Sequence, residues 1–409
     1  MTRDDIIKAA FKAWGRELYR TTSLTDIAQE LGVSKTALYR HFKDKDSILE
    51  AMYPVYFDEC AAFIKNGCDR AASAGSKWEA HLIIMRTIAE YFVRNSEAFI
   101  FSLARVFDYR DKRIISEEFR KRGIDFEQMI VKAGETASYP SKMQLILATL
   151  FFGIAYFHHQ VYESGEKPTE EAIKNALVQI EERIKKGLKL DAGRIASLDY
   201  ENLERQAAGT VYEDTEDNAL LRAVAEAVAE AGPWNATMEM VARRSGLSKS
   251  GLYAHFKSKQ DMLDRLFVTE FNRIANFARA RIEAYNAVED QLYLAIISIV
   301  YYLRSRPEIL VAIDWIKTRQ LELGKGVSGE IFRIVGDLKL DAIRDLDLYA
   351  LGEIAHWILF MIVNTLAWRS SKTTKQSFSS EQINSLEIPN ESFRFLFQYI
   401  SLGLEGLNS

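Results

Sequence analysis

The strongest constraint on the fold of this chain is an internal repeat. Ten residues recur at one constant offset, 248 − 34 = 214 positions, and the register holds without a gap between residues 6–49 and residues 220–263. They are Gly32, Ser34, Lys35, Leu38, Tyr39, His41, Phe42, Lys43, Lys45 and Leu49, which return as Gly246, Ser248, Lys249, Leu252, Tyr253, His255, Phe256, Lys257, Lys259 and Leu263. Repetition at a fixed period indicates duplicated structural units, so we predict two similar halves of about 200 residues each.

Few helix-breaking residues interrupt the 409-residue sequence, which contains six prolines and 21 glycines. Long stretches without such breakers favour helices, so we predict an all-α protein. Hydrophobic residues make up 48% and charged residues 27%, as in globular rather than disordered proteins. The longest apolar runs, residues 143–157 and 354–368, are about 15 residues long, short of the roughly 20 that span a membrane. We interpret both as buried bundle helices.

The start of the chain and its cysteines indicate a cytoplasmic location. The first residues are charged and lack the apolar core of a signal peptide. Two cysteines, Cys60 and Cys68, do not make the disulfide framework typical of small secreted proteins. We interpret them as small apolar side chains in a helix rather than as a redox pair.

Each half is predicted to contain a short head followed by a longer helical body. In the first body, helical patterns cover residues 48–69, 77–93, 99–107, 114–132 and 141–162. An amphipathic helix then closes the half, with Ile173, Leu177, Ile180 and Ile184 on one face. In the second body, the patterns cover residues 262–285, 291–304, 308–323 and 348–369, then a polar loop at 370–380 and a helix at 391–404.

The boundary between the halves is predicted near residues 189–217, which mix charge, glycine and small side chains. The acidic run 212–217 is interpreted as solvated linker and helix start. The predicted divisions are a first head at 1–48, a first body at 49–190, a linker at 191–214, a second head at 215–262 and a second body at 263–409.

Residues 23–42 predict a helix, a glycine turn and a second helix. Ser23 caps the first helix, and Gly32 ends it because glycine readily adopts the left-handed conformation of a tight turn. Ser34 then caps the second helix. That helix has two faces: Leu38 and Phe42 point inward, and Thr36 and Arg40 point outward. In this motif the second helix fits a major groove of DNA.

The distribution of charge agrees with that interpretation. The chain has a formal net charge of −4, so a nucleic-acid binder of this composition must concentrate its positive charge locally. Residues 35–45 carry 4 − 1 = +3, and residues 243–259 carry +5. Attraction to phosphate is therefore predicted at these two places.

The repeated segment resembles the DNA-binding domain of the tetracycline-repressor (TetR) family. The resemblance covers about 50 residues in each half and rests on Ser23, Gly32, Ser34, Leu38, Tyr39, His41, Phe42, Lys45 and Leu49 and on their counterparts in the second half. It implies two fused TetR-like halves, each with a three-helix head and a helical body that binds a ligand and dimerises. Two positions depart from the pattern. Leu18 stands where the family usually has glycine, which Gly232 supplies in the second half, and Ala254 stands in place of Arg40.

The resemblance also implies roles for individual side chains in DNA binding. Residues expected to face base edges are Lys35, Thr36, Ala37 and Arg40, and those expected to hold phosphates are Thr25, Tyr39, His41 and Lys45. The matching residues of the second half are Lys249, Ser250, Gly251, Tyr253, His255 and Lys259. Two alternatives stay open: Arg40 contacts only phosphate or solvent, and His41 is a capped or packed histidine.

The long helices at the end of each half predict that the two halves pair as a built-in pseudo-dimer. Because the outward residues of the two recognition helices differ, the predicted operator has unequal half-sites. The predicted function is transcriptional regulation, with repression modulated by a small molecule. One alternative is a ligand- or partner-binding receptor whose heads no longer bind DNA, and another is a regulator that needs two whole chains.

Neither an enzyme nor a cofactor is predicted, because no catalytic triad, paired carboxylate motif, phosphate loop or metal spacing appears. His158 and His159 are adjacent, and adjacent residues of a helix face different ways, so they do not readily ligate one metal ion. Aromatic side chains of both bodies are expected in the core, some of them around a ligand cavity. These are Phe92, Phe99, Phe107, Phe151, Phe152, Phe157, Tyr293, Tyr301, Tyr302, Trp315 and Trp357.

Overall fold

The computed structural model describes residues 2–16, 23–106, 112–125, 140–164, 166–208, 216–232, 235–317, 348–371 and 388–407. Every regular element within these ranges is a helix, as the breaker-poor sequence predicts. The chain divides into two compact units. Unit 1 is Met1–Thr136 with Gly153–Glu181, and unit 2 is Ala137–Phe152 with Glu182–Ser409. Among the described helices, none is both long and apolar enough to cross a membrane.

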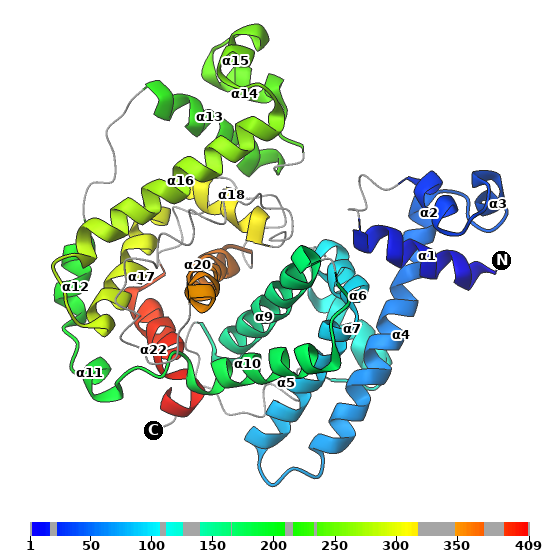
Figure 1. Ribbon diagram of the computed structural model, residues 1–409, viewed down its shortest axis with the longest axis horizontal. Helices are drawn as coiled ribbons and strands as arrows, with labels where there is room; N and C mark the ends of the chain where they lie inside the picture. The colour runs from blue at the N-terminus through cyan, green and yellow to red at the C-terminus, as the bar shows by residue number, and fades with distance from the viewer. Residues whose placement is uncertain are drawn as a thin grey trace. The chain divides into compact units, whose positions relative to one another are not determined.

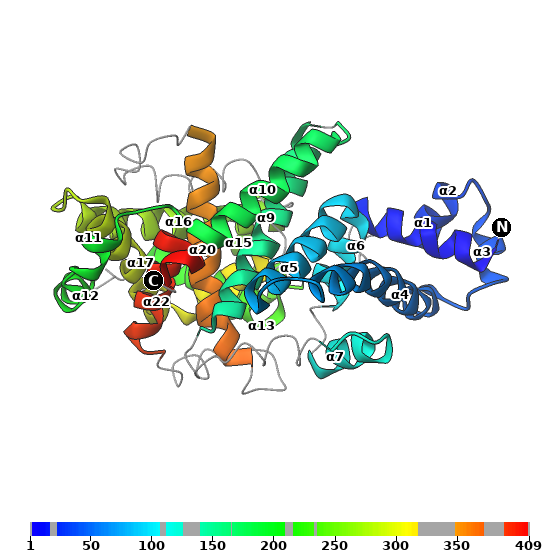
Figure 2. The same ribbon diagram turned by 90° about the horizontal axis from the view of Figure 1, so that it is seen from below.

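Unit 1 begins with three short helices grouped around the start of a long one (Figure 1). Its helices are α1 (Arg3–Arg16), α2 (Leu24–Glu30), α3 (Lys35–Tyr39), α4 (Lys45–Ala71), α5 (Lys77–Arg94), α6 (Ser96–Phe101), the π-helical turn η1 (Ser102–Val106) and α7 (Lys112–Lys121). The long helices α4 and α5 lie side by side in both views (Figures 1 and 2). Two further helices, α9 (Lys142–Ser164) and α10 (Glu170–Lys186), each contribute to both units.

Unit 2 repeats this order. Its own helices are α11 (Ala192–Ala196), α12 (Tyr200–Ala207), α13 (Glu216–Ala231), α14 (Met238–Ser245), α15 (Lys249–His255), α16 (Lys259–Ile282), α17 (Val288–Ser305), α18 (Pro307–Lys317), α20 (Leu348–Ser371) and α22 (Asn390–Leu407). Helices α13, α14 and α15 gather at the start of α16, as α1, α2 and α3 gather at the start of α4 (Figure 1).

The repeat extends beyond the segment that the sequence makes obvious. Helices α5 and α17 begin 288 − 77 = 211 positions apart, and α6 and α18 begin 307 − 96 = 211 positions apart. The contacts repeat as well, since α1 packs against α6 in the first half and α13 packs against α18 in the second. The bodies therefore share a helical layout although their sequences diverge, and the predicted fold class is confirmed.

The two bodies place different chemistry at one equivalent position. Tyr56 of α4 is buried, and its hydroxyl lies 2.6 Å from that of Ser102. The matching residue, at 270 − 56 = 214, is Glu270 of α16, which is only 1% exposed. Its carboxylate accepts a hydrogen bond from Tyr302 Oη at 2.7 Å and lies 3.6 Å from Arg306 Nη2. A hydroxyl pair in the first body thus corresponds to a buried ion pair in the second.

Helix α9 joins the core of unit 2 through the buried Thr149. Its hydroxyl accepts hydrogen bonds from Trp357 Nε1 of α20 at 3.3 Å and from Tyr399 Oη of α22 at 3.0 Å. Both donors are buried, so Thr149 supplies the acceptor that each needs away from water. Arg183 of α10 forms an ion pair with Glu353 of α20. Side chains of the first half therefore complete the core of unit 2.

The end of α10 crosses α22 with direct contact between the two backbones. The amide of Leu188 donates to the carbonyl of Ile400 at 2.8 Å. At the crossing, Gly403 has φ of +63°, and a Cβ atom there would lie 2.3 Å from the carbonyl carbon of Lys185. Only glycine combines this left-handed backbone with so close an approach.

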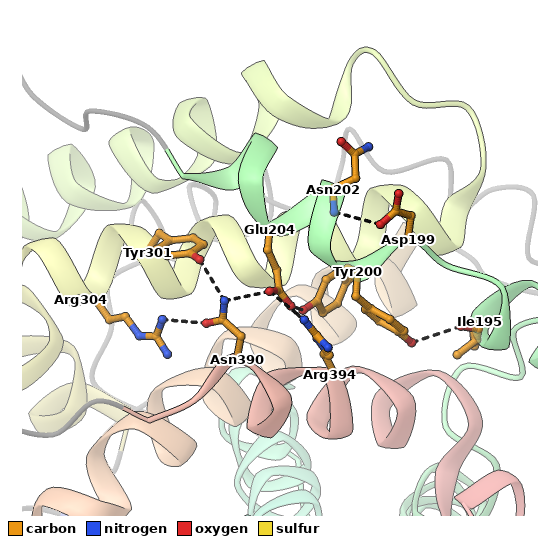
Figure 3. Close-up of polar contacts among 10 residues, drawn as sticks. Ile195, Asp199, Tyr200, Asn202, Glu204, Tyr301, Arg304, Asn390 and Arg394 are labelled. Carbon is orange, nitrogen blue, oxygen red and sulfur yellow. Dashed lines mark hydrogen bonds and ion pairs between the residues drawn. The ribbon is translucent and has the colours of Figure 1, made fainter.

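The described part of the segment expected to link the halves holds two short helices, α11 and α12, and packs within unit 2. Glu204 of α12 accepts hydrogen bonds from Asn390 Nδ2 at 3.1 Å and from Arg394 Nε at 2.7 Å (Figure 3). It also accepts a hydrogen bond from Tyr293 Oη of α17 at 2.6 Å. Burial by itself raises the pKa of the Glu204 carboxyl, but these hydrogen bonds more than offset it, so the pKa lies below its ordinary value. The segment is thereby fixed to α17 and α22.

Most predicted core residues are buried. Cys60 is a buried free thiol whose pKa burial raises to about 12, and Cys68 is a half-buried free thiol. His158 is buried, with Nε2 hydrogen-bonded to the carbonyl of Phe92 at 2.8 Å. Aromatic residues found buried are Phe92, Phe99, Phe152, Phe157, Tyr293, Tyr302 and Trp357, and Phe151 and Tyr301 are partly exposed. Outside the described residues lie Leu18, Phe107, 126–132, 212–215, 318–323 and 372–380, and likewise the Trp315 side chain.

Candidate nucleic-acid interface

The first head is built by two side-chain caps and one glycine. Ser23 Oγ accepts from the amides of Thr25 at 3.1 Å and Asp26 at 3.3 Å, and the Asp26 carboxylate accepts from the amide of Ser23 at 2.5 Å. This reciprocal capping box fixes the start of α2. The chain then turns at Gly32, whose φ is +65°. Ser34 Oγ accepts from the amide of Ala37 at 3.3 Å and starts α3.

The second head has two side-chain caps and a left-handed glycine at the matching positions. Thr237 Oγ1 caps α14 by accepting from the amide of Met240 at 3.2 Å. Gly246 ends α14 in the left-handed conformation, with φ of +69°. Ser248 Oγ then accepts from the amide of Gly251 at 3.0 Å and starts α15. Helix α14 has a simple N-cap where α2 has a capping box.

The inward faces of α3 and α15 anchor them to their heads. Leu38 and Leu252 are 1% and 0% exposed. The outward faces carry the residues that the sequence selects. Exposed side chains are Thr25, Lys35, Thr36, Tyr39, Arg40 and His41 in the first head, and Lys249, Ser250, Tyr253, Ala254 and His255 in the second; Ala37, Lys45, Gly251 and Lys259 are half-buried.

The matched tyrosines are the most exposed large hydrophobic side chains of the described residues. Tyr39 is 50% exposed and Tyr253 is 49% exposed. In the first head, Lys35 Nζ lies over the Tyr39 ring, 5.9 Å from its centroid. The two lysines that begin the next helices, Lys45 of α4 and Lys259 of α16, hold matched places behind the recognition helices. In each head, the recognition helix and the residues at its end therefore present a lysine, a tyrosine and a histidine to solvent.

Glu239 is a residue of the interface that the sequence reasoning missed. It lies 239 − 25 = 214 positions from Thr25 and so occupies the matching place on the supporting helix α14. Its Oε1 atom lies 2.5 Å from Nζ of Lys249 on α15. The hydrogen bond to Lys249 lowers the pKa of Glu239, and the same contact raises the pKa of Lys249. Comparing the halves position by position at the constant offset is the signal that reveals it.

A second ion pair also modifies the charge of the second head. Arg244 of α14 pairs with Glu230 of α13. In the first head the matching place holds Glu30, and Lys12 of α1 approaches it at 3.9 Å. The supporting helix thus supplies the base of this ion pair in the second head and the acid in the first head. Arg244 and Lys249 thus pair with acids that lie outside residues 243–259.

The two heads are helix-turn-helix domains of the kind that places its second helix in a major groove. A family model described as bacterial regulatory proteins of the tetR family matches residues 6–52 and again residues 220–266. Both heads therefore match this family, and the chain carries the matching domain in tandem.

Individual proteins show the same likeness over parts of the chain. An uncharacterized HTH-type transcriptional regulator of Bacillus subtilis (strain 168), YuxN, is 30% identical over 80 residues. The match covers 20% of this chain and 28% of that relative.

Solved structures of two transcriptional regulators align with less than half of the chain. The regulator PfmR from Thermus thermophilus is 24% identical, with 43% of this chain and 95% of that one covered and a TM-score of 0.32. FadR from Bacillus subtilis, solved in complex with stearoyl-CoA, is 18% identical, with 42% and 96% covered and a TM-score of 0.32.

Proposed function

We propose that the chain is a sequence-specific DNA-binding transcriptional regulator, acting as a repressor, that presents one recognition helix from each head. The observation that carries this proposal is the matched outward face of α3 and α15. A tyrosine that is half exposed at the same place in both repeats contributes little to the core. Together with the neighbouring lysine and histidine, it suits a surface that grips phosphates while other side chains read bases.

The roles expected from the sequence are retained in this proposal. Arg40 reads a guanine edge through two hydrogen bonds, and Tyr39, His41 and Lys45 position the head on the phosphate backbone. Base-facing neighbours of Arg40 are Lys35, Thr36 and Ala37, and Thr25 meets a phosphate. Residues of the second head in the matching roles are Lys249, Ser250, Gly251, Tyr253, His255 and Lys259.

We further propose that the two halves of one chain act as a pseudo-dimer. The contacts of Thr149 with Trp357 and Tyr399, and of Arg183 with Glu353, support this because they join helices of the first half to helices of the second. Helix-turn-helix dimers bind half-sites about one DNA turn apart, roughly 34–36 Å. A pseudo-dimer would present two recognition helices from a single chain.

The operator is proposed to have unequal half-sites, because the outward residues differ between the repeats. Arg40 corresponds to Ala254, and Ala37 corresponds to Gly251. We also propose that residues 1–48 and 215–262 are the DNA-binding domains and that the bodies receive a small-molecule effector. The proposal of an effector rests on the match of the heads to the family alone.

Selection of bound duplexes from a random pool tests the proposal, and recovery of unequal half-sites is the expected result. Recovery of strict palindromes would contradict the asymmetric operator. Binding of the selected duplex near 0.1 M salt should then weaken in Arg40→Ala and Lys45→Ala. Binding that is indifferent to both changes, or absent, would favour a receptor whose heads no longer bind DNA.

The solution mass of the chain distinguishes one-chain from two-chain binding. A monomer that binds one operator at low concentration supports the pseudo-dimer. A complex that contains two whole chains on every operator would contradict it, while leaving DNA binding itself intact.

A further inference from the structure

The second head carries an acid where the first head carries a hydroxyl that is expected to meet phosphate. Glu239 and Thr25 occupy the same place on the supporting helices α14 and α2. The Glu239 carboxylate reaches across to Lys249, the residue that matches Lys35 on the other recognition helix. Among the described residues, Lys35 has no carboxylate in ion-pair contact and lies against the Tyr39 ring instead.

We propose that Glu239 is a specificity-determining residue that withholds Lys249 from DNA and repels the phosphate backbone, so that the second head contributes less affinity than the first. This inference rests on the proposed DNA binding. It makes the two heads unequal in strength as well as in the sequence that they read. A chain of this kind selects an operator chiefly through its first half-site.

The position of the pair indicates that it serves the interface rather than the fold. The side chains of Lys249 and Glu239 are 54% and 65% exposed, so neither fills the core of the head. The cap of α14 is Thr237, and the cap of α15 is Ser248, so Glu239 makes neither of the two N-cap hydrogen bonds. An exposed ion pair adds little to stability. Removing this carboxylate therefore changes the charge of the surface and leaves the head folded.

Two charge effects act in the same direction on this face. A lysine that neutralises a phosphate releases a counterion and steepens the dependence of affinity on salt. Lys249 must first leave Glu239 to do so, and a carboxylate placed near the phosphates is repelled by them. Replacing Glu239 should therefore strengthen binding. It should also steepen the dependence of log affinity on log salt concentration by about one, because Lys249 then releases one more counterion.

The test measures the affinity of the full chain for its selected duplex by fluorescence anisotropy over a range of salt concentrations. Glu239→Gln keeps the size of the side chain and removes its charge. Glu239→Thr introduces the residue type that the first head has at the matching position, Thr25. Both should bind roughly three- to tenfold more tightly near 0.1 M salt, with a salt slope steeper by about one. The reciprocal change Thr25→Glu should weaken binding by a similar factor.

A matched control separates this contact from the general loss of one negative charge. Glu226 is an exposed glutamate on α13 of the same head, and Glu226→Gln removes the same charge elsewhere. It should leave affinity and salt slope nearly unchanged. An equal gain from Glu226→Gln and Glu239→Gln would overturn the inference, because the effect would then be unspecific.

A double-mutant cycle tests whether Lys249 is the residue withheld. Lys249→Ala should weaken binding in both backgrounds, but by a factor roughly three- to tenfold larger in the Glu239→Gln background than in the wild-type chain. Equal costs in both backgrounds would overturn the inference while DNA binding persisted. If neither the wild-type chain nor Glu239→Gln bound any duplex, the proposed function would fail, and this inference would fail with it.

Discussion

The two heads share a backbone plan and differ in how they use charge. Both have a serine cap and an inward leucine on the recognition helix, and both turn at a left-handed glycine between the two helices. The first head leaves Lys35 beside a tyrosine ring, whereas the second pairs Lys249 with Glu239. The two repeats therefore share the caps, the inward leucine and the glycine that form the helix-turn-helix fold. They differ in the charged contacts on the exposed face of the recognition helix.

The bodies differ in the same way, but inside their cores. Tyr56 meets a serine hydroxyl in the first body, and Glu270 meets Tyr302 and Arg306 in the second. Replacing one member of a buried ion pair leaves its partner with an uncompensated charge. Removing a hydroxyl from a neutral pair costs only one hydrogen bond. The second body should thus be the more sensitive of the two to substitution at this position.

The largest expected effect comes from Glu270→Leu, which should lower the free energy of unfolding of unit 2 by about 3 kcal/mol. The estimate takes the lower end of the range because Arg306 keeps a second partner, Glu308, at 2.6 Å. Tyr56→Phe should cost about 1 kcal/mol in unit 1. Urea unfolding measures both, and hydrogen exchange localises each loss to α16–α17 or α4–α5. Equal costs for the two changes would remove the contrast between the bodies.

The next effect concerns the outward faces of the recognition helices. Arg40→Ala should weaken binding to the selected operator by about ten- to a hundredfold, because it would remove the proposed bidentate contact to a guanine. The reverse change, Ala254→Arg, adds the same side chain to the exposed face of α15. It should shift the second selected half-site toward that of the first. An unchanged second half-site after Ala254→Arg would show that α15 does not read bases at this position.

Sequence patterns predicted the heads well because a head is specified by local signals. Caps and left-handed glycines act within one turn of the helix, so a residue such as Ser34 or Gly246 indicates a helix end directly from the sequence. The Glu239–Lys249 pair depends instead on two helices folding against each other. Summing charges along residues 243–259 omits this acid, which lies ten residues before Lys249 on another helix, and so overstates the charge available to DNA.

The bodies were less predictable because their polar groups look ordinary in sequence. Glu204 stands in the segment predicted as the linker, and it is held by Tyr293, Asn390 and Arg394. Thr149 stands within an apolar run, where nothing marks it as the acceptor for two buried donors. Whether such a residue is solvated or buried depends on hydrogen-bond partners that are distant in the sequence. The pattern of a single sequence does not identify those partners.

The smallest expected effect is a difference in the response of the two units to acid. Burial lowers the pKa of His158 below 6.5, against a weaker opposite effect of its hydrogen bond to Phe92. A lowered pKa in the folded state means that protonation favours unfolding. The contribution of neutral His158 to stability is therefore complete above pH 6.5 and is lost as the pH falls through the folded-state pKa. Glu204, whose pKa lies below 4.5, responds only in a more acidic range.

Hydrogen exchange between pH 7 and pH 5.5, corrected for the intrinsic pH dependence of exchange, measures this difference. The amides of α5 and α9 around His158 should lose protection over that interval, while those of α12 and α22 around Glu204 keep theirs. His158→Gln supplies a neutral donor for the Phe92 carbonyl at every pH, so protection near it should become independent of pH. Persistence of the pH dependence in this variant would assign it to another group and would leave the two units alike in their response to acid.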